Sequence, residues 1–260
     1  MLFRFLLLLV VLVGCDRAEP PAGDGIALVD DGGHRTVLPA PATRIVSLVP
    51  AATELLFALG AGERLIGRTK WCDYPADAER ITSVGDGMSP NVEAVVGLEP
   101  DLVVSYKSAA NAAAVARFRA LGIAVLEVAL DLQRDFERDA RLLAAAIGRP
   151  EAGDSLARAV AADLERATVN PTERPSVLVL VWNDPPIAIG GGSFLSEIVD
   201  RAGGRNIFGD RPESSFKVSI EAIVAQDPDR VLVTGTGEPA FAARPEWRVV
   251  PAVRERRFVR

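Results

Sequence analysis

The sequence predicts an α/β protein of two Rossmann-like lobes with parallel-type sheets, joined by one long α-helix, with a ligand cleft between the lobes. Residues 91–105 recur without a gap as residues 219–233, and six of the 15 positions are identical. Each copy predicts an N-cap residue, Asn91 or Ser219, then a short helix and a buried strand. Apolar strand patterns alternate with helical patterns, which is typical of parallel sheets that are covered on both faces. Near the middle of the chain, two helical patterns follow each other with no strand between them.

Residues 1–14 form an apolar leader whose one charge is Arg4. Its apolar run is too short to span a bilayer and predicts a signal peptide. The sequence LVGC that ends at Cys15 resembles the lipobox of bacterial lipoproteins, which implies a lipid anchor at Cys15 in the periplasm or on the outer face of the cytoplasmic membrane. The alternative is a disulfide between Cys15 and Cys72. Residues 15–25 are rich in Pro, Ala and Gly and predict a flexible tether.

Residues 26–150 predict the first α/β lobe. A β-hairpin comes first, because two short strand patterns flank an Asp-Asp-Gly-Gly turn. After residue 44, strands alternate with helices whose ends carry Gly or Pro. The expected strands are 26–29, 35–38, 45–49, 64–69, 102–105 and 123–128, and the expected helices are 52–59, 92–98 and 110–121.

A helix at 134–147 is followed directly by another at 151–167, in which Leu156, Val160 and Leu164 form a narrow apolar stripe. At a rise of about 1.5 Å per residue this second helix spans roughly 25 Å, enough for a stiff strut between two lobes. We therefore assign residues 151–170 to the connection. Residues 171–260 predict the second lobe, with strands at 177–182, 187–189, 231–234 and 257–260 and helices at 194–201 and 220–226.

Composition removes several classes of function. The formal net charge of −6 and the pI near 5.0 argue against a nucleic-acid partner. His34 is the only histidine, which excludes histidine-based catalytic triads and zinc sites, so we expect no catalytic or metal-binding residue. Cys72 has no neighbouring base and is expected to be a buried apolar residue.

One pattern is typical of an enzyme. Residues 235–240 read G-x-G-x-x-A, and Glu255 follows at the distance of a ribose-binding acid. A distant alternative is therefore an NAD-dependent oxidoreductase. Pro239 suits a loop, and a lone motif of this kind is weak evidence.

Aromatic residues follow or end the predicted strands at Trp71, Tyr106 and Trp182, and Phe216 lies in the loop before the second copy of the repeat. Because ligands bind outside the carboxyl ends of parallel strands, these four residues predict a cleft for a large planar ligand. The alternative is that each caps the core under a loop. The glycines at 190–192 either bind an anion or form a bare turn that lets two backbones approach closely.

Five segments together resemble a known family: RIVSLVPAATELLFALGAGERLIG, WCDYP, EAVVGLEPDLVVS, AGGRNIF and VSIEAIVAQDPDRVLV. They are similar to the substrate-binding proteins of vitamin B12 and ferric-siderophore ABC importers, whose two lobes are joined by a long helix. The resemblance implies capture of cobalamin or a related corrinoid, with a ferric siderophore or haem as the alternative ligand. It also implies no permanently bound cofactor and no covalent chemistry. The aromatics that line the cleft in the cobalamin branch match Trp71, Tyr106, Trp182 and Phe216.

The resemblance also implies a partner, an ABC permease homodimer with its ATPase subunits. An acidic residue in the first turn of each repeat helix contacts arginines of the permease in this family, and these positions are Glu93 and Glu221. The helix dipole alone stabilises a first-turn carboxylate by about 0.3 to 1 kcal/mol and would explain either one. A pair related by internal symmetry is better explained by a twofold partner.

The chain departs from the family pattern in two places. The segment Gly85-Asp86-Gly87 stands where the family has a further aromatic residue. The resemblance implies a loop and a closing helix beyond the strand at 257–260. The printed sequence does not contain them, so we expect either a fragment or a second lobe that lacks this covering helix and is less stable.

Overall fold

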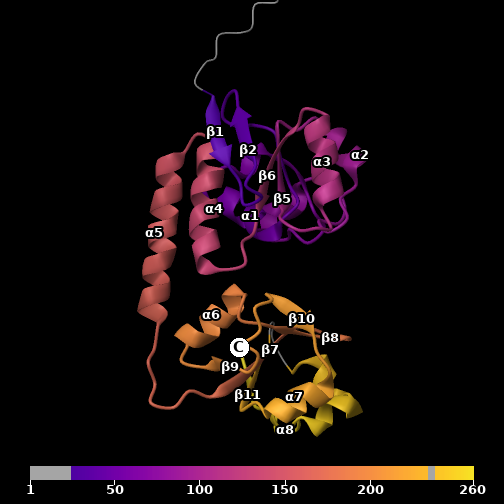
Figure 1. Cartoon of the computed structure of the whole chain (residues 1–260), viewed down its shortest axis with the longest axis vertical. Coiled ribbons are helices and arrows are strands. Elements are labelled where there is room, and N and C mark those ends of the chain that lie inside the picture. The colour runs from indigo at the N-terminus through magenta and orange to yellow at the C-terminus, as the bar shows by residue number, and fades with distance from the viewer. Residues whose placement is uncertain (1–24, 234–237) are drawn as a thin grey trace, which may run out of the picture.

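The computed structural model describes residues 25–233 and 238–260. The predicted signal peptide, Cys15, most of the tether and residues 234–237, which include the first three residues of the G-x-G-x-x-A motif, lie outside this part. The described chain confirms the predicted fold class, since two α/β lobes are joined along one side by a long helix (Figure 1). Over the described ranges, no helix combines the length and the apolar character needed to cross a bilayer.

The first lobe is built on a parallel sheet of four strands in the order β4-β3-β5-β6. A separate antiparallel hairpin, β1 with β2, contacts α4 and β6. In chain order the elements are β1 (Ile26–Val29), β2 (Arg35–Leu38), β3 (Ile45–Ser47), α1 (Pro50–Ala58), β4 (Leu65–Arg68), α2 (Val92–Val96), β5 (Leu102–Tyr106), α3 (Ala112–Ala120), β6 (Ala124–Val128) and α4 (Gln133–Ala146).

Both faces of this sheet are buried, as the continuous apolar strand patterns predict. Successive residues of β5 point to opposite faces. Leu102 and Val104 belong to the core under α1 and α4, whereas Val103 belongs to the core under α2 and α3. Helices thus cover both faces of the sheet, and the carboxyl ends of its parallel strands share one edge, where ligands bind in open α/β sheets.

The second lobe has a mixed sheet of strands in the order β10-β8-β7-β11-β12, with β9 beside β7. Strand β8 is antiparallel to β7, because the turn between them is too short for the crossover that a parallel pair needs. The elements are β7 (Ser176–Asn183), β8 (Pro186–Ile189), α6 (Phe194–Arg201), β9 (Arg205–Asn206), β10 (Ser215–Lys217), α7 (Ile220–Gln226), β11 (Arg230–Leu232), α8 (Pro251–Arg254) and β12 (Phe258–Val259).

The glycines at 190–192 form a turn of close backbone contact. Their N–H groups donate to the carbonyls of Ser214, Arg211 and Glu213. A Cβ atom on Gly190 would lie 2.2 Å from the Glu213 carbonyl oxygen. These N–H groups are therefore engaged and do not bind an anion, so the bare-turn interpretation is the correct one.

The sequence repeat has a structural counterpart in α2 with β5 and in α7 with β11. Asn91 and Ser219 cap the two helices, as predicted, by accepting hydrogen bonds from the N–H groups of Ala94 and Ala222 at 3.0 and 3.2 Å. After each helix the chain takes a positive φ at equivalent acidic residues, Glu99 in one lobe and Asp227 in the other.

The aspartate of each repeated Pro-Asp pair ties its strand to the neighbouring one. Asp101 accepts from Thr43 through its N–H at 2.8 Å and its hydroxyl at 2.9 Å. Asp229 does the same with Ser176, at 2.8 and 2.7 Å. Both partners stand at the start of the strand beside the repeat strand, so the aspartates are identical for a structural reason.

Removing one of these aspartates is expected to destabilise the fold. Asp101→Ala leaves three hydrogen-bonding groups of Thr43 and Arg44 without their acceptor, and we expect the free energy of unfolding to fall by about 1 to 2 kcal/mol. Urea denaturation measures the loss. Asp77→Ala is the control, since Asp77 pairs only with exposed Arg80 and should change stability by less than about 0.5 kcal/mol. Equal effects in the two variants would contradict the structural role.

Helix α5 (Pro150–Ala167) is fixed to the first lobe over its first half and does not stand free along its whole length. At Gly153 an added Cβ would lie 2.5 Å from the Cβ of Ala144 in α4, so glycine permits the close approach of the two helices. Arg141 also donates to Asp154 at 2.8 Å. The end of α5 projects beyond α4 toward the second lobe (Figure 1).

Candidate functional site

The two lobes meet where the chain leaves β6 and enters α4. The carbonyl of Asp131 accepts a hydrogen bond from the Phe194 N–H at 2.5 Å, and the Gln133 N–H donates to Glu197 at 2.7 Å. Arg201 donates to the Gln133 side chain at 2.5 Å. Since β6 is parallel to its neighbours, the carboxyl ends of the whole first sheet face the second lobe.

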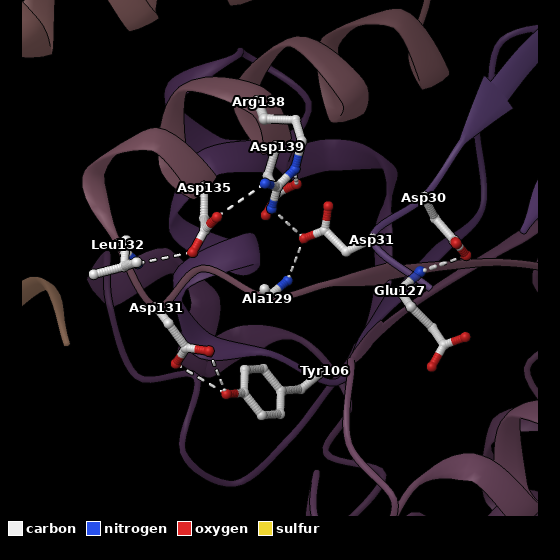
Figure 2. Close-up of polar contacts among 10 residues, drawn as sticks. All are labelled: Asp30, Asp31, Tyr106, Glu127, Ala129, Asp131, Leu132, Asp135, Arg138 and Asp139. Carbon is white, nitrogen blue, oxygen red and sulfur yellow. Dashed lines mark hydrogen bonds and ion pairs between the residues drawn. The ribbon is translucent and has the colours of Figure 1, made fainter. Parts of the chain in front are cut away.

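Tyr106 ends β5 at this junction. Its hydroxyl lies 2.9 and 2.8 Å from the two carboxylate oxygens of Asp131 and donates to them (Figure 2). Burial raises the pKa of Tyr106 well above its usual value, and the hydrogen bond to Asp131 adds to this. The phenol therefore stays protonated around neutral pH and keeps Asp131 as its acceptor.

The other predicted aromatic of the first lobe, Trp71, lies past the end of β4 and is 56% exposed. Its indole N–H donates to Asp86 at 3.3 Å, and the ammonium of Lys70 lies 4.7 Å from its ring centroid. Asp86 also bonds to Lys70 at 3.1 Å. The Trp71 ring is therefore oriented by Asp86, in the segment Gly85-Asp86-Gly87 that replaces the aromatic residue of the family pattern.

The aromatics of the second lobe lie on strands. Trp182, near the end of β7, is 57% exposed, and its indole N–H donates to the Asp184 carbonyl at 2.8 Å. Phe216 is half-buried in β10, where the sequence predicts a loop, because residues 215–217 pair with β8. Its ring packs edge-on against Phe208, with centroids 5.3 Å apart.

The described structure shows no ring contact between any two of Trp71, Tyr106, Trp182 and Phe216. Their common role in a cleft therefore stays a prediction. The alternative that all four cap the core does not fit Trp71 and Trp182, which are more than half exposed.

Behind Asp131 lies a network of carboxylates around one guanidinium. Asp31, Asp135 and Asp139 converge on Arg138 (Figure 2). Asp31 also accepts from the Ala129 N–H at 2.6 Å. Asp135 accepts from the Leu132 N–H at 3.0 Å. Because these two carboxylates hold the backbone on either side of Asp131, the network positions the segment that contacts the second lobe.

Asp139 is the member of this network that is most deeply buried and least well hydrogen-bonded. Its side chain is fully buried, and within the described chain neither carboxylate oxygen has a hydrogen-bond partner. Arg138 Nε lies 3.4 Å away. Burial, reinforced by the negative charge of Asp31, raises the pKa of Asp139 from 3.8 to about 7. The Asp139 carboxyl group therefore keeps its proton up to a pH of about 7.

An apolar cavity of about 390 Å³ opens beside the junction. Leu156, Val160 and Leu164 line one wall of it, so the stripe predicted on α5 faces this space. Tyr74 of the first lobe and Phe194 of the second also line it. The sequence predicts the stripe but not the cavity that it lines, because the other walls come from segments that are distant in the sequence.

Glu93 and Glu221 occupy the first turns of α2 and α7, and both side chains are exposed. Across residues 25–233 and 238–260 neither carboxylate makes a hydrogen bond or an ion pair. In Figure 1 the two helices lie in different lobes, away from α5. Both glutamates are thus available to an external partner.

The remaining candidates give no sign of redox or metal chemistry. Cys72 is 1% exposed, as expected, and its sulfur lies 3.1 Å from the Thr69 hydroxyl. In the described ranges no group of three or more His, Cys, Asp or Glu residues is arranged to hold a metal ion. Cys15 and the first half of the G-x-G-x-x-A motif, residues 235–237, lie outside those ranges.

Asp131 is a site residue outside the set predicted from the sequence. Aromatic residues after each strand define that set, and the same rule applied to polar residues selects Asp131, which follows the strand predicted at 123–128. Asp31 and Asp139 carried no such signal, because their roles depend on contacts across more than 100 residues of sequence.

Comparison with known proteins decides the family. A family model described as periplasmic binding protein matches residues 45–260. The chain belongs to the periplasmic binding protein family. Members of this family are substrate-binding proteins of ABC importers and not enzymes, so the predicted function class is confirmed and the oxidoreductase alternative is set aside. Such proteins act outside the cytoplasm with a permease and an ATPase.

Similar proteins of known sequence support this assignment. A Bacillus subtilis protein named uncharacterized ABC transporter substrate-binding lipoprotein YvrC is 32% identical, over 97% of this chain and 86% of its own length. A vitamin B12-binding protein of Vibrio cholerae is 28% identical, over 81% of this chain and 76% of its own length.

Solved structures are also similar. The vitamin B12-binding protein BtuF of Vibrio cholerae gives a TM-score of 0.70 at 28% identity and covers 85% of this chain and 88% of its own. The haem-binding protein RhuT of Roseiflexus sp. RS-1 gives a TM-score of 0.72 at 28% identity, over 84% of this chain and 88% of its own. The similarity therefore extends to receptors for two different macrocycles.

Proposed function

We propose that this protein captures cobalamin or a related corrinoid between its lobes and delivers it to an ABC permease homodimer. The observation that carries the proposal is the pair of tryptophans, Trp71 and Trp182, that follow or end strands in different lobes and keep more than half of their surface exposed. Tryptophan combines a large apolar face with a polar N–H, and such side chains are enriched at binding interfaces. The similarity to vitamin B12-binding proteins supports a corrinoid as the ligand.

Haem or another ferric chelate is the second candidate ligand, supported by the similarity to the haem-binding protein RhuT. A direct comparison separates the two. Purified protein is titrated with cyanocobalamin, haemin and a ferric siderophore, and binding is followed by visible absorbance and calorimetry. Saturable binding of cyanocobalamin at micromolar concentration or below supports the proposal, and selective binding of haemin or the siderophore overturns it.

The tryptophans give the second test. Trp71→Ala or Trp182→Ala should each weaken corrinoid binding by about tenfold, since burying one face of an indole against a planar ligand contributes on the order of 1.4 kcal/mol or more. Isothermal titration calorimetry measures the dissociation constants. Trp247→Phe is the control, because Trp247 is fully buried in the core of the second lobe. Unchanged affinity in both alanine variants would refute the cleft assignment.

The proposal also includes how the protein is attached to the membrane and how it docks on the permease. Cys15 anchors the chain to the membrane as a lipoprotein, which is supported by the position of the cysteine directly after the apolar leader and by the lipoprotein name of the Bacillus relative. Glu93 and Glu221 contact the two permease subunits. Their exposure and their unpaired carboxylates support this role.

A further inference from the structure

Trp71 lies against an ion pair whose two charges both contact the ring. Lys70 lies over the ring face, 4.7 Å from its centroid, and its ammonium is 3.1 Å from the Asp86 carboxylate. The same carboxylate accepts from the Trp71 indole N–H at 3.3 Å and from the Met88 N–H at 3.0 Å. Asp86 therefore orients the ring and neutralises the cation above it.

Phe216 in the second lobe has the same kind of neighbour, built from different residues. The guanidinium of Arg211 lies 4.5 Å from its ring centroid. Glu213 accepts two hydrogen bonds from Arg211, at 3.0 and 3.3 Å. The two copies of the sequence repeat contain neither arrangement, so duplication does not explain why both lobes combine an aromatic ring, a cation and a carboxylate.

Both carboxylates are ionised near neutral pH. The backbone N–H of Met88, followed by Lys70 and Trp71, holds the pKa of Asp86 below its usual value. The hydrogen bond from Arg211 does the same for the pKa of Glu213. The pairs Lys70–Asp86 and Arg211–Glu213 are thus each neutral overall, with an N–H donor beside a carboxylate acceptor.

The gap between the lobes adds further negative charge. Arg211 lines a cavity of about 540 Å³ together with residues of the first lobe. The charged residues of its lining are Asp131, Arg134, Asp135, Glu197, Asp210 and Arg211, so acids outnumber bases. An anionic group entering this gap meets an unfavourable field, which is strongest at low ionic strength.

We propose that Asp86 and Glu213 are specificity-determining residues that select a planar ligand with an uncharged, amide-bearing edge. This rests on the proposed function, because it assumes that Trp71 and Phe216 stack on the ligand. A primary amide can accept from the cation and donate to the carboxylate of one pair without breaking it. A carboxylate on the ligand edge must instead separate the pair or lie beside a second negative charge, which disfavours its binding.

The test uses one macrocycle with two kinds of edge. Dicyanocobinamide carries amides, and dicyanocobyrinic acid carries carboxylates on the same corrin ring. We expect the wild-type protein to bind the amide corrin at least about tenfold more tightly. Asp86→Asn combined with Glu213→Gln leaves Lys70 and Arg211 without their carboxylates. The preference, measured as the ratio of the dissociation constants of the carboxylate and amide corrins, should therefore shrink by about tenfold to 100-fold. The variant's affinity for the carboxylate corrin should then fall with added salt.

Asp77→Asn combined with Glu255→Gln is the matched control, since it neutralises one surface-paired acid in each lobe and should leave the preference unchanged. Thermal unfolding verifies that both double variants are folded. Binding of the amide corrin with an unaltered preference in the Asp86 and Glu213 variant overturns this inference alone. Failure of the wild-type protein to bind either corrin overturns the proposed function and the inference with it.

Discussion

Replacing both repeat glutamates, Glu93→Ala with Glu221→Ala, is expected to abolish transport and to leave ligand affinity unchanged. Each carboxylate is exposed in a first helical turn and lacks a partner within the described chain. If each pairs with an arginine of one permease subunit, losing one pair costs about 1.4 kcal/mol or more, or tenfold in affinity. Losing both should weaken the complex by on the order of 100-fold. Uptake of labelled ligand by cells and binding to the purified permease measure the effect.

The control must lose the same helix-dipole interaction without a docking role. Glu151→Ala meets this need, because Glu151 is an exposed first-turn glutamate of α5, on the other side of the molecule. It should cost at most about 1 kcal/mol of stability and no transport. Full uptake by the double glutamate variant would contradict the docking assignment, and so would a parallel loss of ligand binding.

Removing Arg138 is expected to have the largest effect on stability, and the effect should depend on pH. Arg138→Met leaves Asp31, Asp135 and Asp139 without the cation that contacts all three in the described structure. Breaking a buried ion pair by deleting one partner costs about 3 to 5 kcal/mol. Because the outer part of Arg138 is exposed to solvent, we expect the lower end, about 3 kcal/mol, at about pH 8.

The pH dependence follows from Asp139. Its pKa is raised from 3.8 to about 7 in the folded protein, so between these values the folded state holds a proton that the unfolded chain has released. Stability therefore falls as the pH rises through this window. Arg138→Met removes a charge that favours the ionised form, so its destabilisation should be smaller at about pH 5 than at about pH 8.

Two further variants isolate the network. Arg141→Met in the same helix removes a cation that pairs with Asp154 at the surface, and it should cost about 0 to 1 kcal/mol at either pH. Asp139→Asn should stabilise the wild-type protein at about pH 8 and flatten its dependence on pH. Urea denaturation of these variants at the two pH values measures all the effects. A penalty for Arg138→Met that does not change with pH would contradict the assignment of the proton to Asp139.

Local signals in the sequence determined most of the secondary structure. The hairpin strands and the helix at 194–201 were predicted with the bounds that the structure has. Asn91 and Ser219 were recognised as helix caps because a capping side chain acts within three residues of itself. These elements depend on neighbours in sequence, so a single chain read in order is enough to find them.

Elements that depend on distant partners were predicted less well. Residues 215–217 read as a loop, yet they form β10 because β8 offers an unpaired edge. Asp101 and Asp229 were recognised as a repeat but not as the residues that tie two strands together, since Thr43 and Ser176 lie more than 50 residues away. Only the folded chain brings these groups within hydrogen-bonding distance.

The sequence by itself determined the two-lobed α/β architecture, the exposed pair of repeat glutamates and the four aromatics, because periodicity, caps and strand ends are written in consecutive residues. Tertiary structure alone decided which charges surround those residues. Asp86 accepts a hydrogen bond from the Trp71 indole, Glu213 pairs with Arg211 over Phe216, and Asp139 on α4 is fully buried. Charge and burial depend on which groups pack nearby in space. The proposed ligand selectivity and the expected pH dependence of stability therefore follow from the tertiary structure and not from the sequence.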